Sequence, residues 1–136
     1  MKIRNYTGHP LVEIQYFLEG ASMLFNHRPR LVELHPTRLE YGGQSHWKPE
    51  PWLQLFLPFT INDPKYLAWL VCHEFQHLQE MEFDPEGRKL EYSWQEPIIA
   101  PWHLRPEEHR ANQAADRLSG SLLVIVGKLA NRALPL

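Results

Sequence analysis

The sequence predicts one α+β domain over residues 1–136. Its expected order is an N-terminal helix, a small three-stranded sheet, a second helix, a long lid-like loop and a C-terminal helical region. Apolar residues recur at helical spacing between residues 10 and 25, and leucines occupy every second position from 53 to 57. The 12 prolines punctuate the chain between such segments. A length of 136 residues with 43% hydrophobic residues suits a single core.

The first helix is predicted from Pro10 to Phe25, and the segment Asn26 to Pro29 should end it because a residue before proline resists the helical region. Its apolar face is expected to comprise Leu11, Ile14, Phe17, Leu18, Met23 and Leu24.

Three short strands are predicted to follow: Leu31 to Leu34, Arg38 to Tyr41 and Trp52 to Leu57, with a turn at Gly42-Gly43. In the third strand, leucines at alternate positions should share one face. An extended substrate could add to the edge of this strand, although an ordinary central strand explains the pattern equally well.

The second helix is predicted from about Lys65 to Met81, because Asn62-Asp63-Pro64 supplies a capping side chain ahead of a proline. The segment from Phe83 to Arg105 contains several prolines and aromatic residues and is expected to be a long connection. The last helical region should run from Pro106 to Leu118. Ser119-Gly120-Ser121 could then bend it before Leu122 to Ala130.

Composition limits the location and the partners of the protein. The formal net charge of −2 gives no electrostatic reason to expect binding to nucleic acid or to an anionic membrane surface. The single cysteine, Cys72, cannot form an internal disulfide, which suits a reducing compartment. The first ten residues lack the apolar stretch of a signal peptide, and no apolar run is long enough to span a bilayer. We therefore expect a cytoplasmic protein.

The second predicted helix carries the sequence His73-Glu74-Phe75-Gln76-His77. Residues four apart share one face of a helix, so His73 and His77 can direct both imidazoles toward one zinc ion. Glu74 is rotated away from that face, where it can act on a zinc-activated water as a general base without binding the metal. The alternative is a pair of surface histidines on an ordinary helix.

A catalytic zinc site needs a third protein ligand, and Glu108 is the preferred candidate. It is predicted to share a helix face with Ala111, Asn112 and Ala115. The small side chains of the two alanines would allow this helix to approach the His73–His77 helix closely. Asn112 could then hydrogen-bond a ligand imidazole from the second shell. His103, Glu107 and His109 are rival ligands, because their side chains offer the same chemistry. Acidic residues after Pro106 also favour the positive end of a helix dipole.

The pattern His73-Glu74-x-x-His77 followed by Glu108-x-x-Ala111-Asn112 resembles the gluzincin clan of zinc metallopeptidases. It is similar to the small ImmA/IrrE-type peptidases, in which a helix and a three-stranded sheet precede the motif helix, and to minimal stand-alone gluzincins. The resemblance implies a zincin-like fold, a zinc cofactor, Glu74 as base and hydrolysis of a peptide or protein substrate.

The leading interpretation is therefore a zinc-dependent metalloendopeptidase. A second interpretation is a zinc-binding but catalytically silent or autoinhibited gluzincin-like module that acts through partner binding, with a homodimer as one form. A third is a metal-free interaction protein in which the motif is coincidental. The segment Leu122 to Val126 fits either the core or a dimer contact.

Overall fold

The chain folds as an α+β domain in the computed structural model, which describes residues 1–8, 11–36, 42–46, 50, 52–57, 63–83 and 105–133. The elements in chain order are β1 (Lys2–Asn5), α1 (Leu11–Phe25), β2 (Leu31–His35), β3 (Gly43–His46), β4 (Trp52–Phe56), α2 (Pro64–Phe83) and α4 (Pro106–Ala133).

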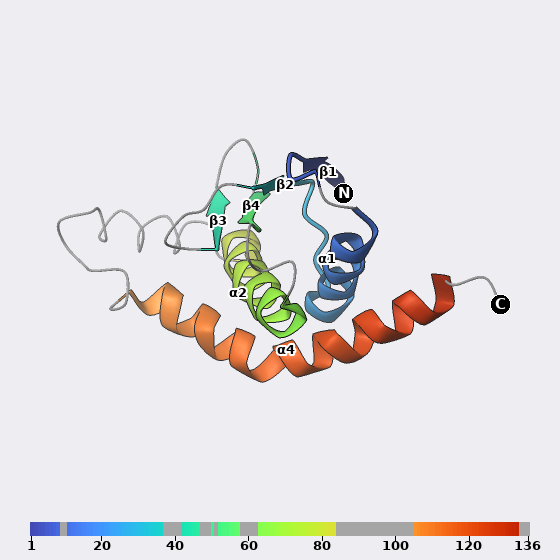
Figure 1. Ribbon diagram of the computed structural model, residues 1–136. Helices are drawn as coiled ribbons and strands as arrows, with labels where there is room; N and C mark the ends of the chain where they lie inside the picture. Colours follow the sequence, from blue (N-terminus) through green and yellow to red (C-terminus); the bar gives the residue numbers. More distant parts are fainter. Residues whose placement is uncertain are drawn as a thin grey trace.

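These elements form layers. Helices α1 and α2 lie side by side against one face of the sheet, and α4 crosses beneath both of them on the side away from the sheet (Figure 1). Alternate strand residues enter the space between the sheet and the two helices, where Val32, Leu34, Leu53 and Leu55 are fully buried. The core therefore lies between the sheet and the helix pair.

Within the described residues, the sheet has four strands in the order β1-β2-β4-β3, whereas three strands were expected. Strands β1, β2 and β4 pair in parallel, and β3 pairs antiparallel with β4. Neither β1 nor β3 was among the predicted strands, and β1 precedes the first helix. Its sequence, Lys-Ile-Arg-Asn, offers little apolar signal, and the strand is specified by pairing with β2.

Two further expectations about the strands need correction. Gly43 begins β3 and is not part of a turn, while the predicted strand from Arg38 to Tyr41 lies outside the described residues. Strand β4 matches the prediction at Trp52, but it lies between β2 and β3. Since both of its edges are paired, an added substrate strand cannot use β4.

Local capping explains where α1 ends and α2 begins. Asn26 has a φ of 50°, and the N–H of His27 donates to the carbonyl of Ser22, which together form a left-handed stop for α1. At the start of α2, Asp63 Oδ1 accepts a hydrogen bond of 3.1 Å from the N–H of Tyr66, and Pro64 occupies the first turn. Both predicted helix limits are thereby confirmed.

Helix α4 is one continuous helix, which in Figure 1 changes direction near its middle. Leu122 is fully buried in the core, whereas Val124 is 58% exposed. The segment from Leu122 to Val126 therefore contributes at least partly to the core. The predicted lid-like loop lies outside the described residues. None of the helices in the described part of the chain is long and apolar enough to cross a membrane.

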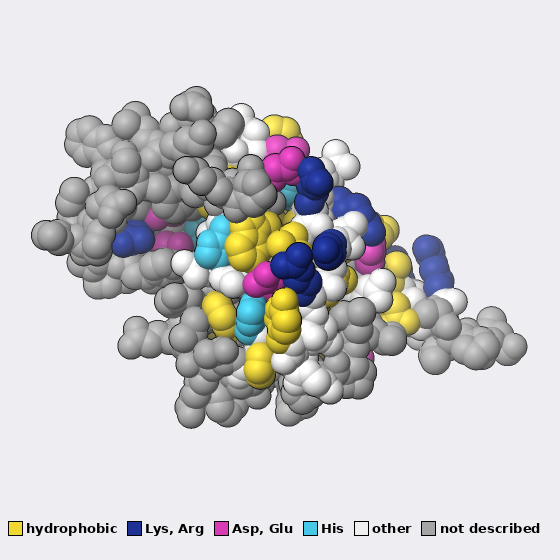
Figure 2. Space-filling model, turned by 90° about the horizontal axis from the view of Figure 1, so that it is seen from above, with side chains coloured by type: hydrophobic (Ala, Val, Ile, Leu, Met, Phe, Trp, Pro, Cys, Tyr) yellow, Lys and Arg dark blue, Asp and Glu magenta, His cyan; other side chains and the backbone are white. Residues whose placement is uncertain are grey.

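The opposite face of the sheet carries polar and aromatic side chains. Figure 2 looks down on the molecule from this side and shows histidine, acidic and hydrophobic groups together near its centre. Glu33 on β2 accepts hydrogen bonds from Gln54 and His35, and Gln54 in turn contacts His46 at 2.7 Å. The hydrogen bond with His35 is the main reason that the pKa of Glu33 lies below its usual value.

Candidate metal centre

Helix α2 places the two histidines of the motif on its side facing α4. His73 and His77 are only 6% and 4% exposed, and their Nε2 atoms lie 3.2 Å apart. Their rings meet edge to face at a centroid distance of 4.9 Å. The one-turn spacing therefore brings both imidazole nitrogens to one point, and the surface-histidine alternative is excluded.

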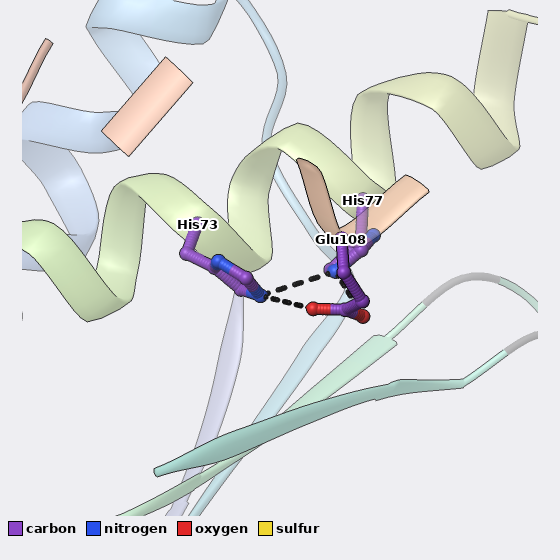
Figure 3. A group of neighbouring side chains, drawn as sticks. All are labelled: His73, His77 and Glu108. Carbon is purple, nitrogen blue, oxygen red and sulfur yellow. Dashed lines mark hydrogen bonds and ion pairs between the residues drawn. The ribbon is translucent and has the colours of Figure 1, made fainter. Parts of the chain in front are cut away.

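Helix α4 contributes a carboxylate to the same point. Glu108 is 4% exposed; its Oε2 lies 3.0 Å from His73 Nε2 and its Oε1 lies 3.0 Å from His77 Nε2 (Figure 3). The N–H groups of Glu108 and His109 donate to the carbonyl of Arg105, which fixes the first turn of α4. The predicted meeting of these three side chains is confirmed.

The geometry of this cluster fits a metal ion. One ligand atom from each of His73, His77 and Glu108 can be chosen so that all lie within 4.8 Å of one another. A four-coordinate zinc ion with bonds of about 2.0–2.1 Å separates neighbouring ligand atoms by about 3.3 Å. The separations of 3.0–3.2 Å need only a small outward adjustment to match this. The nitrogen and oxygen donor set is one that zinc accepts.

Without a metal, the cluster is held together by charge. Burial favours the neutral form of His77, but the hydrogen bond to Glu108 and the negative charges of Glu74, Glu108 and Glu80 outweigh it and raise the pKa of His77. Burial also opposes ionisation of Glu108, yet the hydrogen bonds from His73 and His77 lower the pKa of Glu108 to about 2. The ligand carboxylate is therefore ionised at neutral pH, as metal binding requires.

A stacked tryptophan ring orients the imidazole of His73. The ring of Trp69 stacks on the imidazole at a centroid distance of 5.1 Å, and Trp69 Nε1 donates a hydrogen bond of 2.9 Å to Asp116 on α4. The other ring nitrogen of His73, Nδ1, is buried and has no hydrogen-bond partner among the described residues. The stack and the contacts of Nε2 therefore hold the ring in place, and Trp69 ties it to the packing of α2 against α4.

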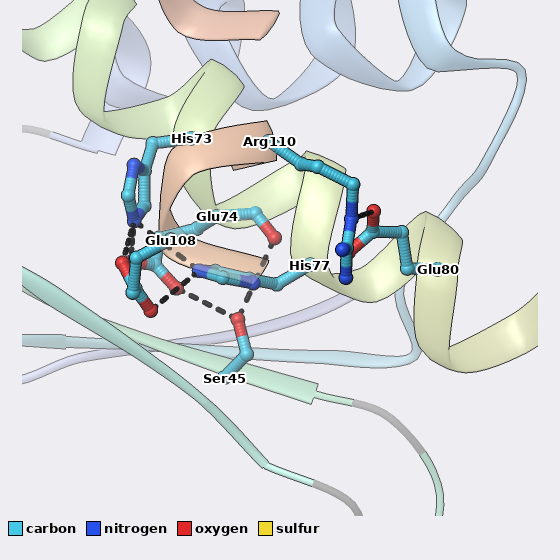
Figure 4. A network of polar contacts seen from close by, with 7 residues as sticks. All are labelled: Ser45, His73, Glu74, His77, Glu80, Glu108 and Arg110. Atoms are coloured by element: carbon cyan, nitrogen blue, oxygen red, sulfur yellow. Dashed lines mark hydrogen bonds and ion pairs between the residues drawn. The ribbon is translucent and has the colours of Figure 1, made fainter. Parts of the chain in front are cut away.

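The side chain of Glu74 extends from α2 toward the sheet. It is 3% exposed, its Oε2 accepts a hydrogen bond of 2.7 Å from Ser45 Oγ on β3, and its Oε1 lies 3.9 Å from His73 Nε2 (Figure 4). The carboxylate therefore lies beside the ligand cluster without belonging to it, as the sequence predicts for a general base.

An ion pair joins the two ligand-bearing helices close to the centre. Arg110 Nε on α4 donates to Glu80 Oε1 on α2 at 2.5 Å (Figure 4). Arg110 follows the ligand Glu108 by two residues, and Glu80 follows His77 by three. The pair fixes the register between the helices where the ligands meet.

The other predicted site residues do not join the cluster. Glu107 is fully buried, and neither of its carboxylate oxygens has a hydrogen-bond partner in the described part of the chain, while His109 is exposed. His103 lies outside the described residues. Asn112 is exposed and makes no hydrogen bond to the orphaned Nδ1 of His73, so the predicted second-shell contact is not formed there.

Sequence reasoning missed the residues that orient the centre from outside it, namely Ser45, Gly43 and Trp69. Trp69 lies four residues before His73, and this helical spacing is a signal that could have identified it. Ser45 and Gly43 carry no such local signal, because their contact with Glu74 depends on how β3 lies against α2.

Comparison with protein-family models, with curated proteins and with solved structures finds no match for this chain. The function of the protein is therefore to be inferred from the chemistry of the centre.

Proposed function

We propose that this chain is a zinc-dependent metallopeptidase, in which His73, His77 and Glu108 bind the metal and Glu74 acts as the general base. The observation that carries the proposal is the arrangement of Glu74 relative to the cluster. Three ligand atoms converge within 4.8 Å, and a further carboxylate lies beside them, with its Oε1 3.9 Å from His73 Nε2. A structural site needs ligands alone, whereas hydrolysis also needs a base next to the metal.

Each part of the centre has a distinct task in this proposal. Zinc bound there would polarise a peptide carbonyl and lower the pKa of a water molecule toward neutrality. Glu74 Oε1 is the oxygen available to take the proton of that water, because Oε2 is engaged by Ser45. Glu74 then delivers the proton to the leaving amine. The substrate class is a peptide or protein, as the similarity to gluzincins implies.

The direct test is Glu74→Gln in the full chain, which removes the base and leaves all three ligands. Purified zinc-loaded protein is assayed against a broad peptide library, with metal content measured on the same samples. We expect one zinc per chain in both proteins, cleavage by the wild type that a chelator abolishes, and at least a hundredfold slower cleavage by the variant.

A matched control is Glu82→Gln, a substitution at an exposed position on the same helix, which should cleave like the wild type. Undiminished turnover by Glu74→Gln would refute the assignment of the base. Absence of zinc from the wild type would refute the metal centre itself.

A second candidate function is a zinc-binding module without turnover, acting through a partner. The burial of the centre favours it, since His73, Glu74, His77 and Glu108 are all at most 6% exposed, and structural zinc sites are closed. Stoichiometric zinc in the wild type, with no cleavage of any library peptide, would support this candidate over the peptidase.

A further inference from the structure

Two residues of β3 form a platform beneath Glu74. Gly43 and Ser45 are two positions apart and therefore share one face of the strand, which here is the face toward α2. Ser45 Oγ donates its hydrogen bond of 2.7 Å to Glu74 Oε2. A Cβ atom at Gly43 would lie 2.8 Å from Glu74 Cγ and 3.0 Å from both Cδ and Oε1.

This platform determines where the Glu74 carboxylate can lie. Real Cβ atoms essentially never approach another heavy atom to less than 3.0 Å, so any side chain at Gly43 would displace Glu74 from β3. Since no unusual backbone angle is found at Gly43, its lack of a side chain serves the close approach. The hydrogen bond from Ser45 then draws the carboxylate into the space that the glycine leaves.

The Glu74 carboxylate could instead lie at the metal, as an additional ligand. Its Oε1 lies 3.9 Å from His73 Nε2, compared with 3.0 Å for the nearest oxygen of Glu108, so the carboxylate is less than one ångström farther from this ligand nitrogen. Zinc binds carboxylate oxygen readily, and four protein ligands produce a closed site. A Glu74 released from β3 could therefore occupy the position that a water molecule and a substrate carbonyl need.

We infer that Ser45 and Gly43 are positioning residues that keep Glu74 out of the coordination sphere and so keep one coordination position open. This inference rests on the metal centre of the proposed function. A hydrogen bond to a charged carboxylate changes the balance between two positions of that carboxylate by a factor of roughly 10 to 100. Loss of Ser45 should therefore shift Glu74 toward the metal by about that factor.

Cobalt(II) is a suitable probe, because its visible absorption reports coordination number and geometry. The full chain is loaded with cobalt as wild type, Ser45→Ala, Ser45→Thr and Gly43→Ala, and each protein is titrated with azide, a small anion that needs an open position. We expect the wild type and Ser45→Thr to bind azide with a clear spectral change. Ser45→Ala and Gly43→Ala should bind cobalt at the same stoichiometry but azide at least tenfold more weakly.

A double variant separates this role from general support of the fold. In Ser45→Ala/Glu74→Gln, position 74 carries an amide, which is a poor metal ligand. The coordination position should then stay open, and azide affinity should return to that of the wild type. Weakened azide binding that Glu74→Gln fails to restore would overturn the inference, as would full azide affinity in both Ser45→Ala and Gly43→Ala. The spectra involve no peptide cleavage, so absent turnover would refute the peptidase while leaving this result intact.

Discussion

If the proposed centre binds zinc, replacement of Glu108 by Gln should remove most of the stabilisation that zinc would give to the fold. A ligand present at a thousand times its dissociation constant stabilises the folded state by about 4 kcal/mol. For 136 residues the entropy of unfolding is about 290 cal/mol/K, so each kcal/mol raises the Tm by about 3.5 °C. Zinc at that excess should therefore raise the Tm of the wild type by about 14 °C.

The contacts of Glu108 determine how much zinc affinity its replacement should remove. Glu108 is the only one of the three clustered ligands that carries a negative charge, and it contacts both imidazoles at 3.0 Å. Its replacement should weaken zinc binding at least a hundredfold, since the loss of an outer hydrogen-bond partner alone can weaken it by about that much. At the same free zinc concentration, the rise in Tm should then shrink to about 5 °C or less.

The assay is thermal unfolding followed by circular dichroism, with free zinc held constant by a metal buffer. Glu107→Gln is the matched control, because this neighbouring carboxylate is also buried but lies outside the cluster, and it should keep the full rise in Tm. The reasoning is refuted if Glu108→Gln responds to zinc like the wild type, or if the loss appears in Glu107→Gln instead.

Two further measurements test the charge state of the centre and its connection to the core. In the metal-free protein, the raised pKa of His77 means that the stability contributed by its charged form is full below pH 6.5 and is lost as the pH rises through the folded pKa. The urea midpoint should therefore fall over that range, less steeply in His77→Gln, while zinc affinity rises because zinc displaces the proton. Leu122→Ala should destabilise the fold by about 2–5 kcal/mol in urea unfolding, and Val124→Ala by at most about 0.5 kcal/mol, because only the first side chain is fully buried. Equal effects of these two substitutions would contradict the packing of α4.

Helices were predictable where the chain carries its own start and stop signals. Asp63 and Pro64 mark the beginning of α2, and Asn26 marks the end of α1, through contacts that span only a few residues. The strands depend on partners distant in sequence. Strand β1 has one apolar residue, Ile3, and β3 begins with a glycine, so neither has the alternation that identifies β4.

The same distinction applies to the centre. His73 and His77 were predictable because their contact depends only on helix geometry, whereas Asn112 shows the limit of that argument. Four residues advance a helix by about 40° beyond a full turn. Viewed down the axis of α4, the buried residues Glu107, Ala111 and Ala114 lie to one side of Glu108. The advance of about 40° carries Asn112 to the other side, where it is exposed to solvent.

The burial of so many ionisable groups at one point is itself an argument for function. His73, Glu74, His77 and Glu108 occupy positions between packed layers where apolar side chains would stabilise the fold at least as well. Buried charge is costly unless it is paired, and in the metal-free cluster the raised pKa of His77 favours a proton there that pairs with Glu108. A divalent cation would satisfy the two nitrogens and the carboxylate together, while Glu74, held by Ser45, would stay outside the ligand cluster. With a metal bound, stability would account for three of these four side chains, and the proposed hydrolysis would account for the fourth.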